Sequence, residues 1–205
     1  MPVNPAARDP EVTAVILAGG KGRRMGGEDK GLLELNGRLL IDYIIDALRP
    51  QSGHIIINAN RNLDRYRASG YPVVADMLGD HFGPLAGMAT GMQAATTPLL
   101  LVVPCDSPFI PAQLCSMLRI ELEKKGADIS VAYDGTRIQP VCSMLRCKLL
   151  PDLLSYLNAG RRRVDTWVEQ QRLALVDFSA VPDSFLNMNN PSTRQIIERK
   201  LAGQT

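Results

Sequence analysis

The chain has 205 residues, of which 45% are apolar and 21% are charged, proportions typical of a globular protein in water. This length favours one domain that buries roughly 70% of the surface of its unfolded chain, so that neither a disulfide nor a metal is needed for stability. The 23 Lys and Arg residues against 21 Asp and Glu residues give a net charge of +2, which excludes the strongly basic surface of a dedicated nucleic-acid-binding protein.

Nothing in the sequence indicates export or a membrane span. The apolar stretch at residues 99–103 ends at Pro104, whereas a membrane span needs roughly 20 apolar residues. Residues 1–10 have neither the apolar core of a secretory signal nor the composition of a transit peptide, and we expect them to be a disordered lead-in. The four cysteines form no CxxC pair and only two His are present, which argues against structural zinc. We therefore expect a cytoplasmic protein with reduced thiols that binds no membrane and no nucleic acid.

Short segments rich in Val and Ile alternate with amphipathic stretches of helical length. Strands are predicted at residues 12–17, 54–57, 73–75, 99–103, 129–133, 141–145 and 173–178. Helices are predicted at residues 40–48, 63–68, 85–95, 111–125, 148–157 and 164–170, and a last helix begins after Asn190 with Pro191 in its first turn. This alternation predicts one α/β domain over residues 1–205, built as a three-layer α/β/α sandwich with a mostly parallel, twisted sheet. The Asp134-Gly135 step predicts one antiparallel hairpin late in the chain.

A glycine-rich loop, LAGGKGRRMGGEDK at residues 17–30, follows the first predicted strand. Open α/β sheets bind ligands beyond the carboxyl ends of their strands, and glycines let backbone N–H groups approach an anion. The loop also carries four cations, namely Lys21, Arg23, Arg24 and Lys30. A Walker A loop does not fit, because Gly27 is followed by Glu28, and Met25 replaces the third glycine of a dinucleotide-binding fingerprint. The loop therefore predicts a polyphosphate site, and the alternative is a flexible surface loop with solvated charges.

The fourth predicted strand runs into PCDSP at residues 104–108. This places Asp106 at the carboxyl edge of the sheet, facing the glycine-rich loop, where it could bind Mg²⁺. Because Mg²⁺ takes one or two protein carboxylates and fills its shell with phosphates and water, one Asp suffices. The alternative is that Asp106 or Ser107 caps the helix predicted from residue 111. We expect Cys105 to be a packed neighbour and not a nucleophile, since no His lies nearby in the sequence.

Several polar residues are further candidates. Asn58 follows the second predicted strand, where it could contact a base or ribose or form a turn, and Asp76 ends the third, where its carboxylate could accept hydrogen bonds. The GPLAGM segment at residues 83–88 opens a helix that could offer N–H donors or pack closely on the sheet. In FLNMNNP at residues 185–191, alternation directs Asn187 and Asn189 to one side, and a turn with a cap is the alternative, above all for Asn190. The Arg run at residues 161–163 could bind a phosphate or remain solvated.

The loop LAGGxGxRMG with Lys30, together with PCDSP, resembles the motifs of nucleotidyltransferases that use an activated nucleoside triphosphate. Among these, the chain most resembles the molybdenum cofactor guanylyltransferases from about residue 12 to residue 201. Cytidylyl relatives more often begin the loop with Leu-Ala-Ala-Gly, so Ala18-Gly19-Gly20 favours guanine. The resemblance implies a Rossmann-like nucleotidyltransferase fold and the transfer of GMP from GTP to the terminal phosphate of molybdopterin, with release of pyrophosphate.

The resemblance also implies roles for individual residues. The catalytic residues would be Arg24, Lys30 and Asp106, with Asp106 as the ligand of Mg²⁺. Nucleotide contacts would come from Leu17, Ala18, Gly19, Lys30, Asn58, Asp76 and Asp106. Asn187 and Asn189 would contact the molybdopterin acceptor.

Other functions stay open at this point. One is cytidylyl transfer to molybdopterin or nucleotidyl transfer to a sugar phosphate by the same fold. Another is a non-catalytic adaptor that binds nucleotide or cofactor and delivers the cofactor to a partner enzyme. The resemblance also admits molybdoenzyme apoproteins or their chaperones as protein partners.

Overall fold

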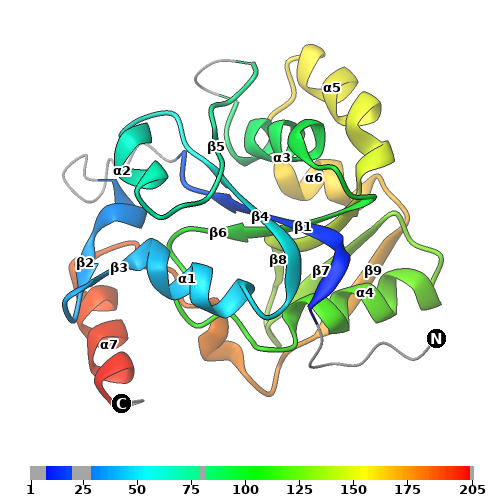
Figure 1. The fold of residues 1–205 in the computed structure, drawn as a ribbon. Helices are drawn as coiled ribbons and strands as arrows, with labels where there is room; N and C mark the ends of the chain where they lie inside the picture. The colour runs from blue at the N-terminus through cyan, green and yellow to red at the C-terminus, as the bar shows by residue number, and fades with distance from the viewer. Residues whose placement is uncertain (1–7, 20–28, 79–81, 204–205) are drawn as a thin grey trace.

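The computed structural model describes residues 8–19, 29–78 and 82–203, and a seven-stranded sheet lies at its centre (Figure 1). The strands follow the order β5-β4-β1-β6-β8-β7-β9. They are β1 (Asp9–Leu17), β4 (Ser52–Asn58), β5 (Val73–Val74), β6 (Leu99–Pro104), β7 (Ile129–Tyr133), β8 (Ile138–Arg146) and β9 (Leu173–Asp177). Strand β8 runs antiparallel to its neighbours β6 and β7, and the other pairs are parallel. The prediction of a mostly parallel sheet with one late hairpin is confirmed.

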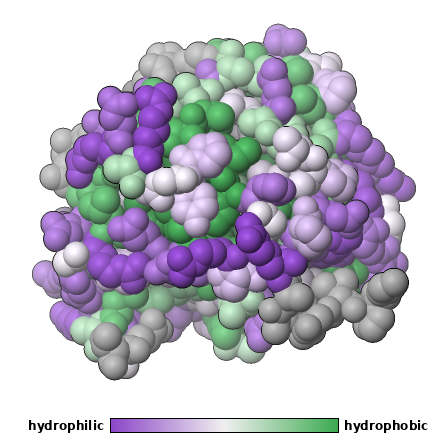
Figure 2. All heavy atoms as spheres, viewed as in Figure 1, coloured by the Kyte–Doolittle hydropathy of each residue, from purple (hydrophilic) through white to green (hydrophobic). Residues whose placement is uncertain are grey.

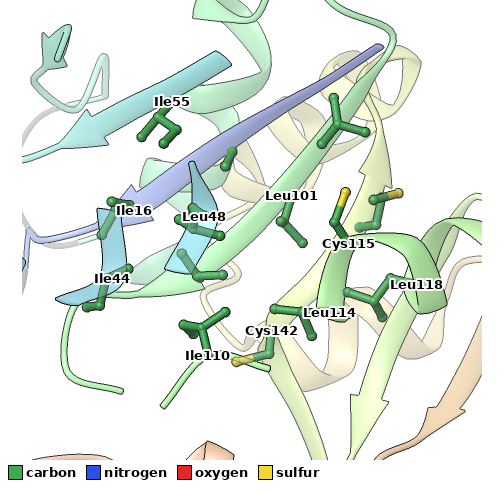
Figure 3. Packing of buried hydrophobic residues seen from close by; sticks show 14 of the residues in the cluster. Ile16, Ile44, Leu48, Ile55, Leu101, Ile110, Leu114, Cys115, Leu118 and Cys142 are labelled. Carbon is green, nitrogen blue, oxygen red and sulfur yellow. The ribbon is translucent and has the colours of Figure 1, made fainter. Parts of the chain in front are cut away.

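Helices cover both faces of this sheet. In the described ranges they are α1 (Leu40–Leu48), α2 (Leu63–Arg67), α3 (Pro84–Ala94), α4 (Leu114–Lys124), α5 (Leu150–Asn158), α6 (Val164–Glu169) and α7 (Pro191–Ala202). Side chains alternate along β1, so that Ala14 and Ile16 pack with α1 and α4, while Val15 packs with α3, α5 and α6. Figure 3 shows part of the first cluster, where Ile16 lies near Ile44 of α1 and Leu118 of α4 belongs to the same core. The predicted α/β/α sandwich is confirmed.

A small hairpin, β2 (Glu34–Leu35) and β3 (Arg38–Leu39), is absent from the sequence prediction, because two-residue strands have no periodicity. Its turn is Asn36-Gly37, with φ of 49° and 77°, and an Asn-Gly pair is the signal that could have identified it. Helix α7 packs beside this hairpin (Figure 1), where Arg194 Nη2 donates to Glu34 O at 2.9 Å. The short 3-10 turns η2 (Lys30–Leu32), η3 (Cys147–Leu149) and η4 (Pro182–Phe185) are also absent from the prediction.

Strand β1 begins earlier than expected. The prediction of a disordered lead-in over residues 1–10 is wrong for Asp9 and Pro10, which belong to β1, while residues 1–7 lie outside the described ranges. Asp9 N donates to Gln51 O at 3.1 Å, and the Asp9 carboxylate pairs with Arg119 of α4 at 2.5 Å. These contacts with distant segments supply the order that the local sequence lacks. The other predicted strands and helices end within three residues of the observed bounds.

The surface agrees with a globular fold. Figure 2 shows an apolar area at the centre of one face, surrounded by hydrophilic side chains. No helix in the described part of the chain is long and apolar enough to cross a bilayer. All four cysteines are free thiols, and three of them are buried.

Close contact between β1 and β4 requires glycine at position 53. A β-carbon at Gly53 would lie 2.8 Å from Pro10 Cα and 2.9 Å from Asp9 O, and backbone atoms cannot rotate away. We expect Gly53→Ala to lower the free energy of unfolding by about 1–3 kcal/mol, measured by urea denaturation. The control is Gly203→Ala, whose β-carbon would meet Arg199 O at an ordinary 3.7 Å. Equal stability of the two variants would contradict this account of the contact.

Candidate active site

Three parallel strands end side by side at one edge of the sheet. Leu17 of β1 is in register with Asn58 of β4 on one side and with Pro104 of β6 on the other. The chain stays paired just beyond these ends, because Ala18 N donates to Asn58 O at 2.8 Å and Cys105 N donates to Leu17 O at 3.1 Å. The segments that carry the predicted nucleotide contacts Leu17, Ala18, Gly19, Asn58 and Asp106 therefore meet at this edge, as the parallel sheet requires.

Lys30 lies at the centre of this edge. Its Nζ donates to Asp106 Oδ2 at 2.9 Å and to Asn189 Oδ1 at 2.6 Å, and the Lys30 and Asp106 side chains are both partly buried. Lys30 opens η2, Asp106 follows β6, and Asn189 precedes α7, so three distant parts of the chain supply the contact. The structure thus brings together a predicted phosphate-binding cation, a predicted metal ligand and a predicted acceptor-binding amide.

The segment before α7 is fastened to the turn after β6. Met188 N donates to Asp106 O at 2.9 Å, and Ser107 Oγ donates to Asn187 Oδ1 at 2.5 Å. The backbone is turned here, because Asn189 N donates to Asn187 O at 2.9 Å, so simple strand alternation does not describe it. Both amides nevertheless reach the 106–107 turn, Asn187 through Ser107 and Asn189 through Lys30.

The alternative roles as helix caps are resolved by the structure. Asn190 caps α7, since its side chain accepts from Thr193 N at 2.8 Å. The residue before α4 is Gln113, so neither Asp106 nor Ser107 caps that helix. The Asp106 carboxylate is therefore available to bind Lys30 and a ligand at this edge of the sheet.

A second polar cluster lies next to this edge, at the carboxyl end of β4 and just beyond β4 and β5. Asp76 Oδ1 accepts from Asn58 Nδ2 at 2.9 Å, and Asp76 Oδ2 accepts from Asn60 Nδ2 at 2.7 Å. Asp76 N also donates to Asn60 Oδ1 at 2.8 Å, so Asn60 holds both the backbone and the side chain of Asp76. Asn58 and Asp76 are predicted to contact the nucleotide, whereas no role is predicted for Asn60 from the sequence. The signal was the spacing of two residues, which places Asn58 and Asn60 on the same side of an extended chain.

Gly87 of α3 packs against this cluster. A β-carbon there would lie 2.4 Å from Asn58 Oδ1 and 2.7 Å from Leu17 Cδ2. Close packing is thus the reason for a glycine at this position, and the contacts are with two predicted site residues. The first residue of α3 is Pro84, which has no N–H to donate to a ligand.

The residues near Asp106 suit a hard cation. Asp106 offers a carboxylate, the amide oxygen of Asn187 contacts Ser107, and the amide oxygen of Asn189 contacts Lys30, which also contacts Asp106. In the described ranges there is no group of three or more His, Cys, Asp or Glu side chains that could hold a metal ion. This donor set fits Mg²⁺ that takes one protein carboxylate and completes its shell with phosphates and water. It does not fit a site built wholly from protein ligands.

Cys105 is fully enclosed, and burial raises the pKa of its thiol far above the ordinary value. A thiol in that state is a poor nucleophile, in agreement with the prediction that it is a packed neighbour.

Two further sets of cations are predicted from the sequence. Arg24, with residues 20–28, lies outside the described ranges. In the 161–163 run, the Arg161 guanidinium lies 5.5 Å from the centre of the Tyr156 ring and that of Arg162 lies 4.0 Å from the centre of the Phe82 ring. Arg163 pairs with its neighbour Asp165 at 2.5 Å. All three arginines therefore have protein contacts, and binding of a phosphate by this run stays a prediction.

Comparisons with known proteins agree with this geometry. The family model of the MobA-like NTP transferase domain matches residues 14–174. The chain is similar to the molybdenum cofactor guanylyltransferase of Shewanella sediminis, with 45% identity over 192 residues that cover 94% of this chain and 98% of the relative. The enzyme of the same name from Shewanella loihica is 43% identical over 193 residues, with the same coverage of 94% and 98%.

Solved structures with similar folds carry related names. Molybdopterin-guanine dinucleotide biosynthesis protein A from Archaeoglobus fulgidus has a TM-score of 0.78 at 20% identity and covers 93% of this chain and 99% of its own. The 2-C-methyl-D-erythritol 4-phosphate cytidylyltransferase from Thermus thermophilus has a TM-score of 0.70 at 16% identity and covers 92% and 98%. At these identities the likeness establishes the fold, which is shared by guanylyl and cytidylyl enzymes.

The contact at Gly87 gives a test of the cluster around Asn58. An added methyl group would collide with Asn58 Oδ1, so the amide must leave the position in which its Nδ2 donates to Asp76. We expect Gly87→Ala to weaken binding of Mg-GTP, the ligand that the sequence predicts, by about tenfold. The control on the same helix is Gly91→Ala, whose β-carbon would meet Val15 Cγ1 at 3.1 Å and Leu100 Cδ2 at 3.2 Å, away from the site. Titration calorimetry on both variants decides, and similar dissociation constants would remove Asn58 from the binding site.

Proposed function

The chain belongs to the MobA-like NTP transferase family, in which its relatives are molybdenum cofactor guanylyltransferases, and from this premise we propose that it transfers GMP from GTP to the terminal phosphate of molybdopterin. The products would be pyrophosphate and molybdopterin guanine dinucleotide. The observation that supports the proposal is the contact of Lys30 with Asp106 and Asn189, because these are the residues predicted to bind phosphate, Mg²⁺ and the acceptor.

The reaction needs no protein nucleophile. An oxygen of the terminal phosphate of molybdopterin is already anionic at neutral pH and attacks the α-phosphorus of GTP. The new P–O bond forms as the bond between the α-phosphorus and the oxygen that bridges it to the β-phosphorus breaks, and that oxygen leaves with pyrophosphate. Negative charge then grows on the departing pyrophosphate, so that positioning and fixed cations supply most of the rate enhancement.

Lys30 and Asp106 would exchange partners when the substrate binds. In the structure, the ammonium of Lys30 donates to Asp106 Oδ2 and Asn189 Oδ1. Phosphate oxygens of GTP would take over the ammonium, and this would release the Asp106 carboxylate for a cation. Mg²⁺ bound to Asp106 would neutralise charge on the triphosphate and on the departing pyrophosphate. Arg24 would bind phosphates beside Lys30.

Each of the two polar clusters would bind a different substrate. Leu17, Ala18 and Gly19 would contact the base and ribose, next to Asn58 and Asp76. A carboxylate at position 76 can accept from guanine N1–H and N2–H or from ribose hydroxyls, and its two contacts with Asn58 and Asn60 support its orientation. On the other side, the amides of Asn187 and Asn189 would contact molybdopterin. GTP and molybdopterin would thus be bound next to Lys30 by residues from different parts of the chain.

Further properties follow from the same proposal. Location in the cytoplasm, and passage of the product to molybdoenzyme apoproteins or their chaperones, remain predictions of the sequence. A non-catalytic adaptor would bind GTP without releasing pyrophosphate, and this outcome separates it from the enzyme.

The roles of Lys30 and Asp106 are tested by pyrophosphate release with GTP, Mg²⁺ and molybdopterin. We expect Lys30→Ala and Asp106→Asn each to lower kcat by about 10²–10³-fold, because each removes charge stabilisation of the transition state. Asp106→Asn should also raise the Mg²⁺ concentration needed for half-maximal rate. Lys124→Ala is the control, since this exposed lysine on α4 pairs with Glu121 at 3.2 Å, and its rate should stay within about twofold of the wild type. Retained turnover in both site variants would overturn the scheme.

A further inference from the structure

A buried carboxylate lies next to Lys30 in the sequence. The side chain of Asp29 is 4% exposed, and it accepts hydrogen bonds from Tyr66 Oη and, at 3.1 Å, from Asn62 Nδ2. The Nε of Arg61 lies 3.6 Å from Asp29 Oδ2 and balances its charge. A buried carboxylate is unfavourable unless it is paired and hydrogen-bonded, so these contacts hold Asp29 firmly.

Tyr66 of α2 contacts the chain on both sides of Lys30. It is fully buried, and burial raises the pKa of its phenol well above the ordinary value, so that it remains a hydrogen-bond donor to Asp29. Its ring also lies on the backbone of residue 31, where a β-carbon on Gly31 would be 2.6 Å from Tyr66 Oη. Tyr66 therefore donates a hydrogen bond to the residue before Lys30 and packs against the residue after it.

The side chain of Asn62 donates to the Asp29 carboxylate and does not cap its own helix. It stands at the start of α2 with φ of 51°, a left-handed conformation that Asn tolerates better than most residues. Asn is a common helix cap, yet its side chain makes no capping hydrogen bond and donates to Asp29 instead.

We propose that Asp29, clamped by Tyr66 and Asn62, is the positioning residue that directs Lys30 toward Asp106 and the phosphates of the substrate. This rests on the proposed function, because it assigns Lys30 to the triphosphate. The same segment that carries the clamp begins at Asn58 and Asn60, which hold Asp76. Residues 58–66 thus contact both Asp76 and the two residues that flank Lys30.

The test is a double-mutant cycle with Tyr66→Phe and Lys30→Ala in the full-length protein. Tyr66→Phe keeps the ring on Gly31 and removes the hydroxyl that binds Asp29. We expect it to weaken Mg-GTP binding and to lower kcat by about tenfold each in the wild-type background. In the Lys30→Ala background the same change should alter both quantities by about twofold or less, because the group that the clamp positions is gone. The loss of melting temperature from Tyr66→Phe should be equal in the two backgrounds.

Tyr156→Phe is the matched control. Tyr156 lies on the other face of the sheet, and its hydroxyl donates to Arg163 O at 3.1 Å, so this variant also loses one hydroxyl hydrogen bond. Its GTP binding should stay within about twofold of the wild type. Should Tyr66→Phe not fold, Asp29→Asn replaces it in the same cycle, since the amide keeps the size of the carboxylate and removes its charge.

The outcomes separate the two proposals. Equal effects of Tyr66→Phe with and without Lys30, or no effect on GTP binding, would overturn the positioning role of Asp29. A wild-type protein that binds Mg-GTP but releases no pyrophosphate with molybdopterin would contradict the proposed function. In that case the cycle on GTP binding still decides whether Asp29 acts through Lys30.

Discussion

The ammonium of Lys30, shared between the carboxylate of Asp106 and the amide oxygen of Asn189, is the interaction on which the rest of the site depends. It joins parts of the chain that are 76 and 159 residues apart in the sequence. A partly buried cation needs acceptors, and these two are supplied by the turn after β6 and by the segment before α7. A triphosphate would bind the ammonium of Lys30, and a divalent cation would bind the carboxylate of Asp106. The substrate would therefore replace the contact between these two side chains.

The parallel sheet and a few glycines make this arrangement possible. Because β1, β4 and β6 run in the same direction, the described residues that directly follow them lie at the same edge of the sheet. Gly87 then lets α3 approach Asn58 and Leu17, and Gly31 lets the Tyr66 ring lie against the backbone beside Lys30. At both positions a β-carbon would collide with atoms of site or clamp residues, so the glycines serve packing around the site and not flexibility.

The sequence was sufficient to predict the sheet and to place several candidate site residues at one edge of it, and the reasons for its failures are physical. Continuous apolar segments identified the buried strands, and the chemistry of the residues that follow them pointed to Lys30, Asn58 and Asp106. The order of Asp9 was missed because it comes from Arg119 and Gln51, which are far away in the sequence. Asp29 was missed because a carboxylate beside a lysine has the appearance of a solvated pair, and its contacts with Tyr66 and Asn62 exist only in the folded chain.

Binding of a guanine nucleotide for transfer at this edge is tested by thermal unfolding with Mg²⁺ and GTP, CTP, UTP or ATP at equal concentration. A ligand that binds only the folded protein, at about 100 times its dissociation constant, adds roughly 2.7 kcal/mol of stability. GTP should raise the melting temperature more than CTP, UTP or ATP, and Lys30→Ala should reduce this increase. An equal response to all four nucleotides, or a preference for CTP, would contradict the assignment of guanylyl transfer.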